Sequence, residues 1–224
     1  MSHEANAILA STLWVAAWWI TEAIPIAATS LLPIILFPLS GALSIEDTSS
    51  SYGHKYIFLY LGGFILALAI EKWNLHKRIA LNIISKIGTD VRKIILGFMV
   101  ATAFLSMWIS NTATAVMMLP IGIAIIKQMK DLKSTDEDEN QIFGKALLLS
   151  IAFSASIGGL ATLIGTPPNL VFTGIVYELY QIEISFLDWI ILGLPISIVL
   201  LIISWVYITR FAFKFNQTNF SDGQ

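Results

Sequence analysis

The stretch that decides the fold is residues 94–126, IILGFMVATAFLSMWISNTATAVMMLPIGIAII, which holds 33 uncharged residues between Lys93 and Lys127. As one helix it would be about 50 Å long, and the hydrocarbon core of a bilayer is only about 30 Å thick. Two complete spans with a turn would need more than about 40 residues. The polar residues 106–112, SMWISNT, stand at its centre. This arithmetic predicts a re-entrant hairpin over 92–126, two half-length helices that return to the side they entered.

A second uncharged run, residues 146–177, is also interrupted near its middle. It contains Gly158-Gly159 and then Gly165-Thr166-Pro167-Pro168-Asn169. Two adjacent prolines cannot lie inside a continuous helix, because each lacks an amide donor and its ring clashes with the preceding turn. The pattern therefore predicts a broken helix within 145–214, followed by a final transmembrane helix over 189–209.

The composition places the chain in a membrane. Of 224 residues, 56% are hydrophobic and 12% charged, whereas about a quarter of a soluble domain is charged. The net charge of -2 lacks the basic excess that nucleic-acid binding requires. With no cysteine and three scattered histidines, we expect no transition-metal site. The apolar runs hold no Ser/His/Asp arrangement, paired carboxylates or HExxH, so we expect no enzyme.

Shorter uncharged intervals predict the other helices. Residues 5–21 and 23–45 are expected to cross the membrane and return, and residues 56–70 to form a third, short span. An amphipathic surface helix is expected in the basic segment 72–93, although a basic loop that alternates by chance is the other interpretation. Together these form a scaffold-type region over 1–91. The surface helix would set Trp73, Ala80, Ile83, Ile84 and Ile87 opposite Lys72, Lys77, Arg78 and Lys86.

The distribution of basic residues supports the hairpin. Segment 72–93 carries six Lys and Arg, and segment 127–145 carries four. Because cytoplasmic loops collect basic residues, both ends of the hairpin are expected in the cytoplasm. We predict a multi-pass protein of the cell membrane, with a cytoplasmic loop over 127–144 and a disordered tail over 215–224.

The centre of the 33-residue run offers uncharged oxygen donors. The first half-helix ends there and points carbonyl oxygens at the break, which favours a cation. The Ser106 and Ser110 hydroxyls and the Asn111 amide oxygen are hard, neutral ligands that suit an alkali cation better than zinc. Carbonyl oxygens near Gly165 would complete the shell if the two breaks meet. The simpler alternative is that these polar residues only pack between helices, and that residues 165–169 only kink a helix.

An anion is expected beside the cation. The second half-helix begins just after Asn111-Thr112, and its free N–H groups favour a carboxylate. Neither long run contains Lys or Arg. Bound cations must therefore balance an anionic substrate, which predicts coupling between the two.

Four motifs resemble the divalent anion/sodium symporter family of dicarboxylate and citrate carriers: TEAIP at 21–25, LGGFILALAIEKW at 61–73, SNTATAVMMLP at 110–120 and IGTPPN at 164–169. The resemblance implies an all-α integral membrane protein with a re-entrant helical hairpin and a broken helix, one half of an inverted-repeat transporter. It also implies the site residues: Ser106, Ser110, Asn111 and Gly165 would bind sodium, and Asn111, Thr112 and Thr166 would bind the substrate.

By this resemblance the chain is the N-terminal half of a sodium-coupled secondary transporter for di- and tricarboxylates such as succinate and citrate. The coupling ion is Na⁺, with no other metal, and the mechanism is an elevator in which hairpin and broken helix slide against a scaffold. Its partners would be the carboxylate, the lipid bilayer, a missing C-terminal repeat and a second copy in a homodimer. A sodium-independent dicarboxylate exchanger and a non-transporting truncated membrane module are the alternatives.

Overall fold

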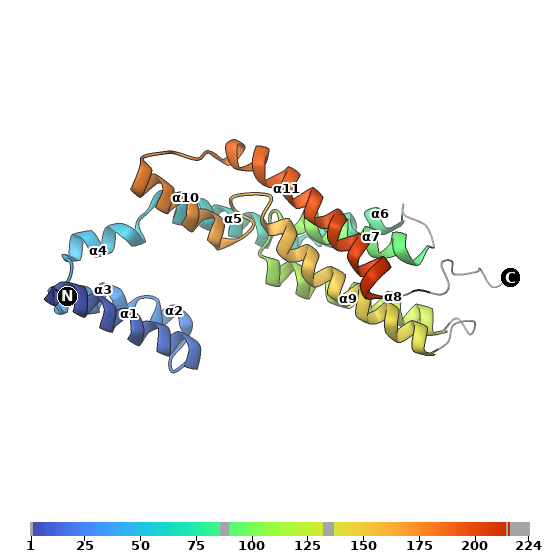
Figure 1. Cartoon of the computed structure of the whole chain (residues 1–224), viewed down its shortest axis with the longest axis horizontal. Coiled ribbons are helices and arrows are strands. Elements are labelled where there is room, and N and C mark those ends of the chain that lie inside the picture. Colours follow the sequence, from blue (N-terminus) through green and yellow to red (C-terminus); the bar gives the residue numbers. More distant parts are fainter. Residues whose placement is uncertain (1, 86–89, 132–136, 214, 216–224) are drawn as a thin grey trace. The chain divides into compact units, whose positions relative to one another are not determined.

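The computed structural model of the chain describes residues 2–85, 90–131, 137–213 and 215 (Figure 1). The described residues are predominantly helical, as expected for an all-α protein. They divide into two compact units, Met1–Phe58 and Leu59–Gln224.

The first unit contains four helices before the start of α5: α1 (His3–Thr21), α2 (Ile26–Thr29), α3 (Leu32–Leu39) and α4 (Ile45–Tyr52). The hydroxyl of Ser2 caps α1 by accepting from the Ala5 amide, and α1 ends at Glu22 in the left-handed conformation. The Tyr52 hydroxyl donates to the Ser30 carbonyl at 2.6 Å, which ties the end of α4 to the α2–α3 connection.

The interval 23–45 differs from the expected single span. It forms two short helices, and the apolar stretch Ile26–Leu39 is shorter than a membrane crossing requires. Pro33 lies in the first turn of α3, where its missing N–H is tolerated, but it cannot continue a helix from α2. The prolines therefore divide the interval.

Three described helical stretches are long and apolar enough to cross a membrane: Ile45–Lys72, Asn140–Gly159 and Phe186–Ala212. The first joins α4 to α5 (Lys55–Lys72), and the last joins α11 (Phe186–Val206) to the π-helix η1 (Tyr207–Ala212). The spans expected over 56–70 and 189–209 coincide with helices. A shorter apolar helix covers Asn111–Lys127.

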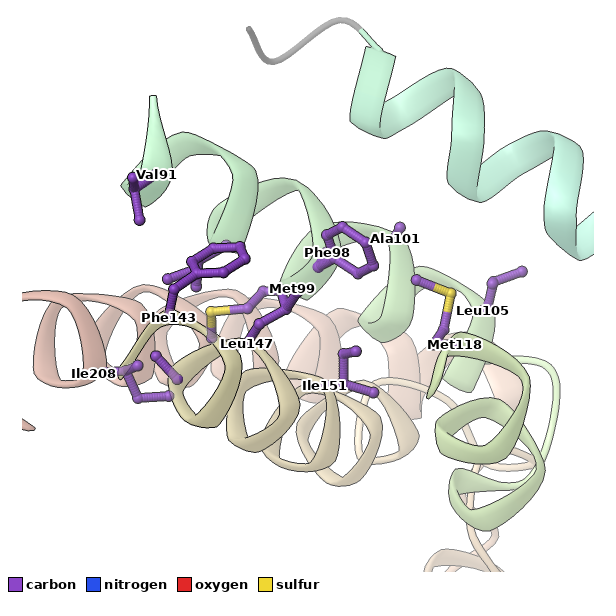
Figure 2. Close-up of a cluster of buried hydrophobic side chains, with 12 residues drawn as sticks. Val91, Phe98, Met99, Ala101, Leu105, Met118, Phe143, Leu147, Ile151 and Ile208 are labelled. Atoms are coloured by element: carbon purple, nitrogen blue, oxygen red, sulfur yellow. The ribbon is translucent and has the colours of Figure 1, made fainter. Parts of the chain in front are cut away.

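The second unit is built on α7 (Val91–Ser106), α8 (Asn111–Asp131) and α9 (Glu137–Gly159), with α6 (Leu75–Ser85) packed against α7. Figure 2 shows the core between these helices, from Val91 and Phe143 at one end to Leu105 and Met118 at the other. Burying each large apolar side chain contributes about 1.5–3 kcal/mol. The α7–α9 core therefore holds the ends of α7 and α9 in place.

Other expectations for this unit are met in part. A helix, α6, forms where the surface helix was expected, but Lys86, Ile87 and the side chains of Ala80, Ile83 and Ile84 lie outside the described residues. The expected loop 127–144 is helical at both ends, since α8 runs to Asp131 and α9 begins at Glu137. The tail from residue 216 onward also lies outside the described residues.

Candidate functional site

Two helix breaks occur where the sequence predicts them. The first, residues 107–110, separates α7 from α8, and the second, residues 160–166, separates α9 from α10 (Pro167–Tyr180). At the first break, the Ser110 hydroxyl accepts from the Ala113 amide at 3.3 Å and caps the start of α8. At the second, Thr166 is extended and two prolines open α10, positions where a missing N–H breaks no helical hydrogen bond.

The two breaks meet in the folded unit. The Ser106 hydroxyl lies 2.6 Å from the Ala155 carbonyl oxygen and 2.9 Å from the Asn111 amide oxygen, so it joins α7, α8 and α9. The Thr162 hydroxyl donates to the Met107 carbonyl, which ties the second break to the first. The two breaks are therefore in contact through Met107 and Thr162.

Three glycines allow this close approach. A Cβ on Gly159 would collide with the Asn111 side chain, and one on Gly158 would collide with the backbone of Ala103. A Cβ on Gly165 would lie 2.5 Å from the Gly159 carbonyl oxygen. Gly158 and Gly159 are therefore required by packing of α9 against α7 and Asn111, and Gly165 by packing of the second break against the end of α9.

Side chains satisfy the free carbonyl groups at the end of α9. The Asn169 amide group donates to the carbonyls of Gly159 at 2.9 Å and Thr162 at 2.7 Å. The Thr162 hydroxyl accepts from the Gly165 amide at 3.1 Å. From α11, Trp189 donates to the Leu160 carbonyl at 2.9 Å and Ser197 to the Ile157 carbonyl at 3.0 Å. A helix end buried without such partners would be costly.

The predicted site residues fall into two groups. Ser106 is fully buried and bonded to Asn111, and Gly165 is buried against Gly159, which in turn touches Asn111. Ser106 and Asn111 are therefore in direct contact, and Gly165 is connected to them only through Gly159. Ser110 is half-buried and caps α8, Thr112 is exposed and Thr166 is half-buried. Among the described residues, no hydrogen bond joins Thr112 or the Thr166 side chain to Ser106, Asn111 or Gly165.

Sequence reasoning missed the residues that hold the breaks together. Ala155 and Thr162 contact residues 49 and 55 positions away, so no local pattern indicates them. Asn169 belongs to the IGTPPN motif, and an amide side chain directly after a double proline was the available signal. Its side chain caps carbonyls and is buried, so it stabilises the break.

The electrostatics of this region come from dipoles and neutral oxygens. The segments 94–126 and 146–177 contain no charged side chain. The described residues contain no group of three His, Cys, Asp or Glu that would hold a metal ion. The carboxyl ends of α7 and α9 carry partial negative charge, and the amino ends of α8 and α10 carry partial positive charge, about half an elementary charge each. The carboxyl ends of these helices therefore favour a cation, and the amino ends favour an anion.

Comparison with known proteins decides the family. The family model described as citrate transporter matches residues 16–218. The chain belongs to the citrate transporter family. Over 226 residues, this family member is 52% identical to the sodium-dependent dicarboxylate transporter SdcS of Staphylococcus saprophyticus, an alignment that covers 100% of the chain and 44% of the relative. It is 54% identical over 219 residues to SdcS of Staphylococcus aureus strain USA300, which covers 97% of the chain and 42% of that relative.

These matches confirm the resemblance carried by the four motifs, and both the family and the matched relatives are named as transporters rather than enzymes. The chain spans less than half the length of the curated relatives that it matches. Its apolar helices agree with a membrane protein.

Proposed function

We propose that this chain is the N-terminal half of a Na⁺-coupled secondary transporter for di- and tricarboxylate anions. The observation that carries the proposal is the meeting of the two helix breaks at Ser106, Asn111 and Gly159, without a charged side chain in either run. Irregular backbone at membrane depth is tolerated where it is buried in protein or lines a polar cavity. The similarity to transporters named sodium-dependent and dicarboxylate supports the choice of ion and substrate.

The sodium ion would bind on the Ser106 side of the junction. Because the Ser106 hydroxyl can donate its proton to the Ala155 carbonyl, its lone pairs remain for a cation. The Asn111 amide oxygen, 2.9 Å away, is a second neutral donor. Ser110 and the Gly165 carbonyl would complete the shell. The partial negative charge at the end of α7 favours a cation at this position.

The carboxylate would bind at the start of α8. Here the free N–H groups of the first turn, the Asn111 amide and the exposed Thr112 hydroxyl offer donors. The start of α10 offers fewer, because Pro167 and Pro168 have no N–H, so Thr166 would be the contact from that side. The start of α8 is therefore the stronger anion-binding end.

Coupling follows from the charge balance. A cation and a carboxylate about 4 Å apart attract by about 4 kcal/mol at an effective dielectric constant near 20. With no Lys or Arg in either run, sodium supplies this attraction, which corresponds to about a thousandfold in carboxylate affinity.

The proposal includes the topology and the transport movement. Residues 92–126 form the re-entrant hairpin, and α9 and α10 form the broken helix of one inverted repeat. The compact core that joins α7, α8 and α9 supports their movement as one body in an elevator mechanism, against a scaffold in a homodimer. The complete carrier includes a second repeat and spans the cell membrane several times.

Cysteine labelling tests the topology. With Arg92→Cys and Lys127→Cys introduced singly into the complete carrier, an impermeant maleimide should label both positions from the cytoplasmic face. Labelling from opposite faces would contradict the re-entrant hairpin.

Uptake tests the function. Proteoliposomes with the complete carrier, this chain together with the second half that its relatives carry, are given labelled succinate or citrate with external NaCl or choline chloride. We expect uptake only with Na⁺. Equal uptake in choline, stimulated by carboxylate inside the vesicles, would identify a sodium-independent exchanger. Unchanged anion and cation binding after Asn111→Ala would instead favour a non-transporting module.

A further inference from the structure

Three hydroxyl groups inside the second unit are buried and have no hydrogen-bond partner. They belong to Thr102 on α7, Thr114 on α8 and Ser154 on α9, and each of these residues is 0% exposed. A buried polar group without a partner is unfavourable, so each one calls for a physical explanation. We call these three residues the inner hydroxyl residues.

Three other buried helical hydroxyls donate to a carbonyl in the preceding turn. Ser150, one turn before Ser154 on the same helix and equally buried, donates to the Ala146 carbonyl at 2.7 Å. Thr209 donates to Trp205 at 2.7 Å, and Thr173 to Leu170 at 2.9 Å. The same bond to the preceding turn is available in principle to any helical Ser or Thr. The inner hydroxyl residues are therefore exceptions, because they do not make this local hydrogen bond.

Helix spacing relates all three exceptions to the Ser106–Asn111 pair. Thr102 precedes Ser106 by four residues, so it lies on the same face of α7, about 6 Å away along the helix axis. Thr114 follows Asn111 by three residues, so it lies on the same face of α8, about 4.5 Å away. Ser154 directly precedes Ala155, the acceptor of the Ser106 hydroxyl. It also shares a face with Gly158, which packs on the α7 backbone at Ala103. Helix spacing thus indicates a layer of these three residues within about one helical turn of the Ser106–Asn111 pair.

The surroundings of this layer are apolar. Leu105, Met118 and Ile151 lie within one turn of Thr102, Thr114 and Ser154 respectively and belong to the buried core drawn in Figure 2. No charged side chain occurs in either of the segments 94–126 and 146–177. A ligand in this layer must therefore be small and must be satisfied by neutral oxygens, which suits a monovalent alkali cation better than a divalent one.

We propose that Thr102, Thr114 and Ser154 form an inner sodium site, which holds a second Na⁺ one helical turn below the Ser106–Asn111 site. The remaining ligands would be backbone carbonyl oxygens or water. Two cations at this spacing repel each other, so the inner ion is held when the carboxylate anion is also bound. The inference rests on the proposed Na⁺-coupled transport and adds a second ion to it.

The test measures the Na⁺ dependence of succinate uptake by the complete carrier. The variants Thr102→Val, Thr114→Val and Ser154→Ala remove one hydroxyl each with little change in shape. We expect the Na⁺ concentration for half-maximal uptake to rise at least fivefold and the Hill coefficient for Na⁺ to fall below the wild-type value. Thr102→Ser keeps the hydroxyl and should restore the wild-type Na⁺ dependence. The matched control is Ser150→Ala, which removes a buried hydroxyl that has its own partner and should leave the Na⁺ dependence unchanged.

A melting measurement in choline chloride accompanies the uptake assay. If the variants melt at or above the wild-type temperature while their Na⁺ dependence weakens, the hydroxyls bind sodium and are not needed for folding. Unchanged Na⁺ dependence in all three variants, with raised melting temperatures, would overturn the inner site and leave only a structural or water-binding role. If Asn111→Ala still weakens Na⁺ activation in that case, the proposed function stands and only the inner site fails. If wild-type uptake does not respond to Na⁺, both proposals fail together.

Discussion

The two helix breaks of the second unit are held in different ways. The second break, residues 160–166, is closed by its own neighbourhood: Asn169 bonds the carbonyls of Gly159 and Thr162, and α11 supplies two further donors. The first break, residues 107–110, is tied mainly across to the second, through Ser106 and through the Met107 carbonyl. The second break is thus held by its own local hydrogen bonds, and the first is held mainly by its contacts with α9 and the second break.

The contact between the two breaks should be the most sensitive point. Gly158→Val should prevent the α7–α9 approach, because its Cβ would meet the Ala103 backbone, which cannot rotate away as a side chain can. Overpacking of this kind typically costs about 1–3 kcal/mol and here acts on the whole junction, so we expect a loss at the upper end of this range. The melting temperature and the monodisperse fraction after detergent extraction measure the effect.

The control for this prediction is Gly62→Ala on α5, where a Cβ would meet nothing within 4 Å. Alanine is the better helix former, so the control should be neutral or stabilising by up to about 1 kcal/mol. Equal losses in Gly158→Val and Gly62→Ala would contradict the packing of the two breaks.

Removing the Asn169 amide, which donates to carbonyls of the second break, should have the next largest effect. Asn169→Leu keeps the approximate volume but leaves the Gly159 and Thr162 carbonyls without this donor, at a cost of about 2–3 kcal/mol. Chemical or thermal unfolding of the purified protein measures the loss. Asn6→Ala on the exposed face of α1 is the control and should change stability by less than about 0.5 kcal/mol. Unchanged stability in Asn169→Leu would show that the second break does not depend on this side chain.

Asn111 should separate ligand binding from stability. Its amide oxygen accepts from Ser106 and the residue is only half-buried, so Asn111→Ala should cost about 1 kcal/mol of stability. The same change removes a proposed ligand of both ion and substrate, and should weaken Na⁺ activation of uptake at least tenfold. A loss of stability as large as that of Asn169→Leu, with normal Na⁺ activation, would reverse the roles assigned to the two breaks.

The smallest effect is expected at the cap of α8. Ser110→Ala removes the hydroxyl that accepts from the Ala113 amide, a capping interaction of about 0.5–1 kcal/mol. Ser110→Thr keeps a capping hydroxyl and should retain most of the stability. If Ser110 also binds sodium, the Ala variant should weaken Na⁺ activation while the Thr variant preserves it, which uptake at graded NaCl concentrations resolves.

The positions of the breaks could be predicted from the sequence because they follow from local rules. An uncharged run too long for one span and too short for two indicates a break near Ser110, and Pro167-Pro168 indicates one near residue 165. The contacts that join the breaks could not be predicted in the same way. The pairs Ser106–Ala155 and Met107–Thr162 are distant in sequence, and glycines at 158 and 159 are explained only by the backbone and side chain they face.

The same distinction explains the error in the first unit. Counting uncharged residues predicted one span over 23–45, but the prolines at 25 and 33 limit α2 to Ile26–Thr29 and start a separate helix at Leu32. Run length alone is therefore informative only when the residues inside the run can form a continuous helix.

The most direct test of the account is the equilibrium binding of labelled succinate to the complete carrier as a function of Na⁺, with choline keeping the ionic strength constant. If the junction of the two breaks holds both ions, the affinity for succinate should be at least tenfold higher in saturating NaCl than in choline chloride, and Asn111→Ala should remove most of the difference. The same affinity in both salts would contradict the account.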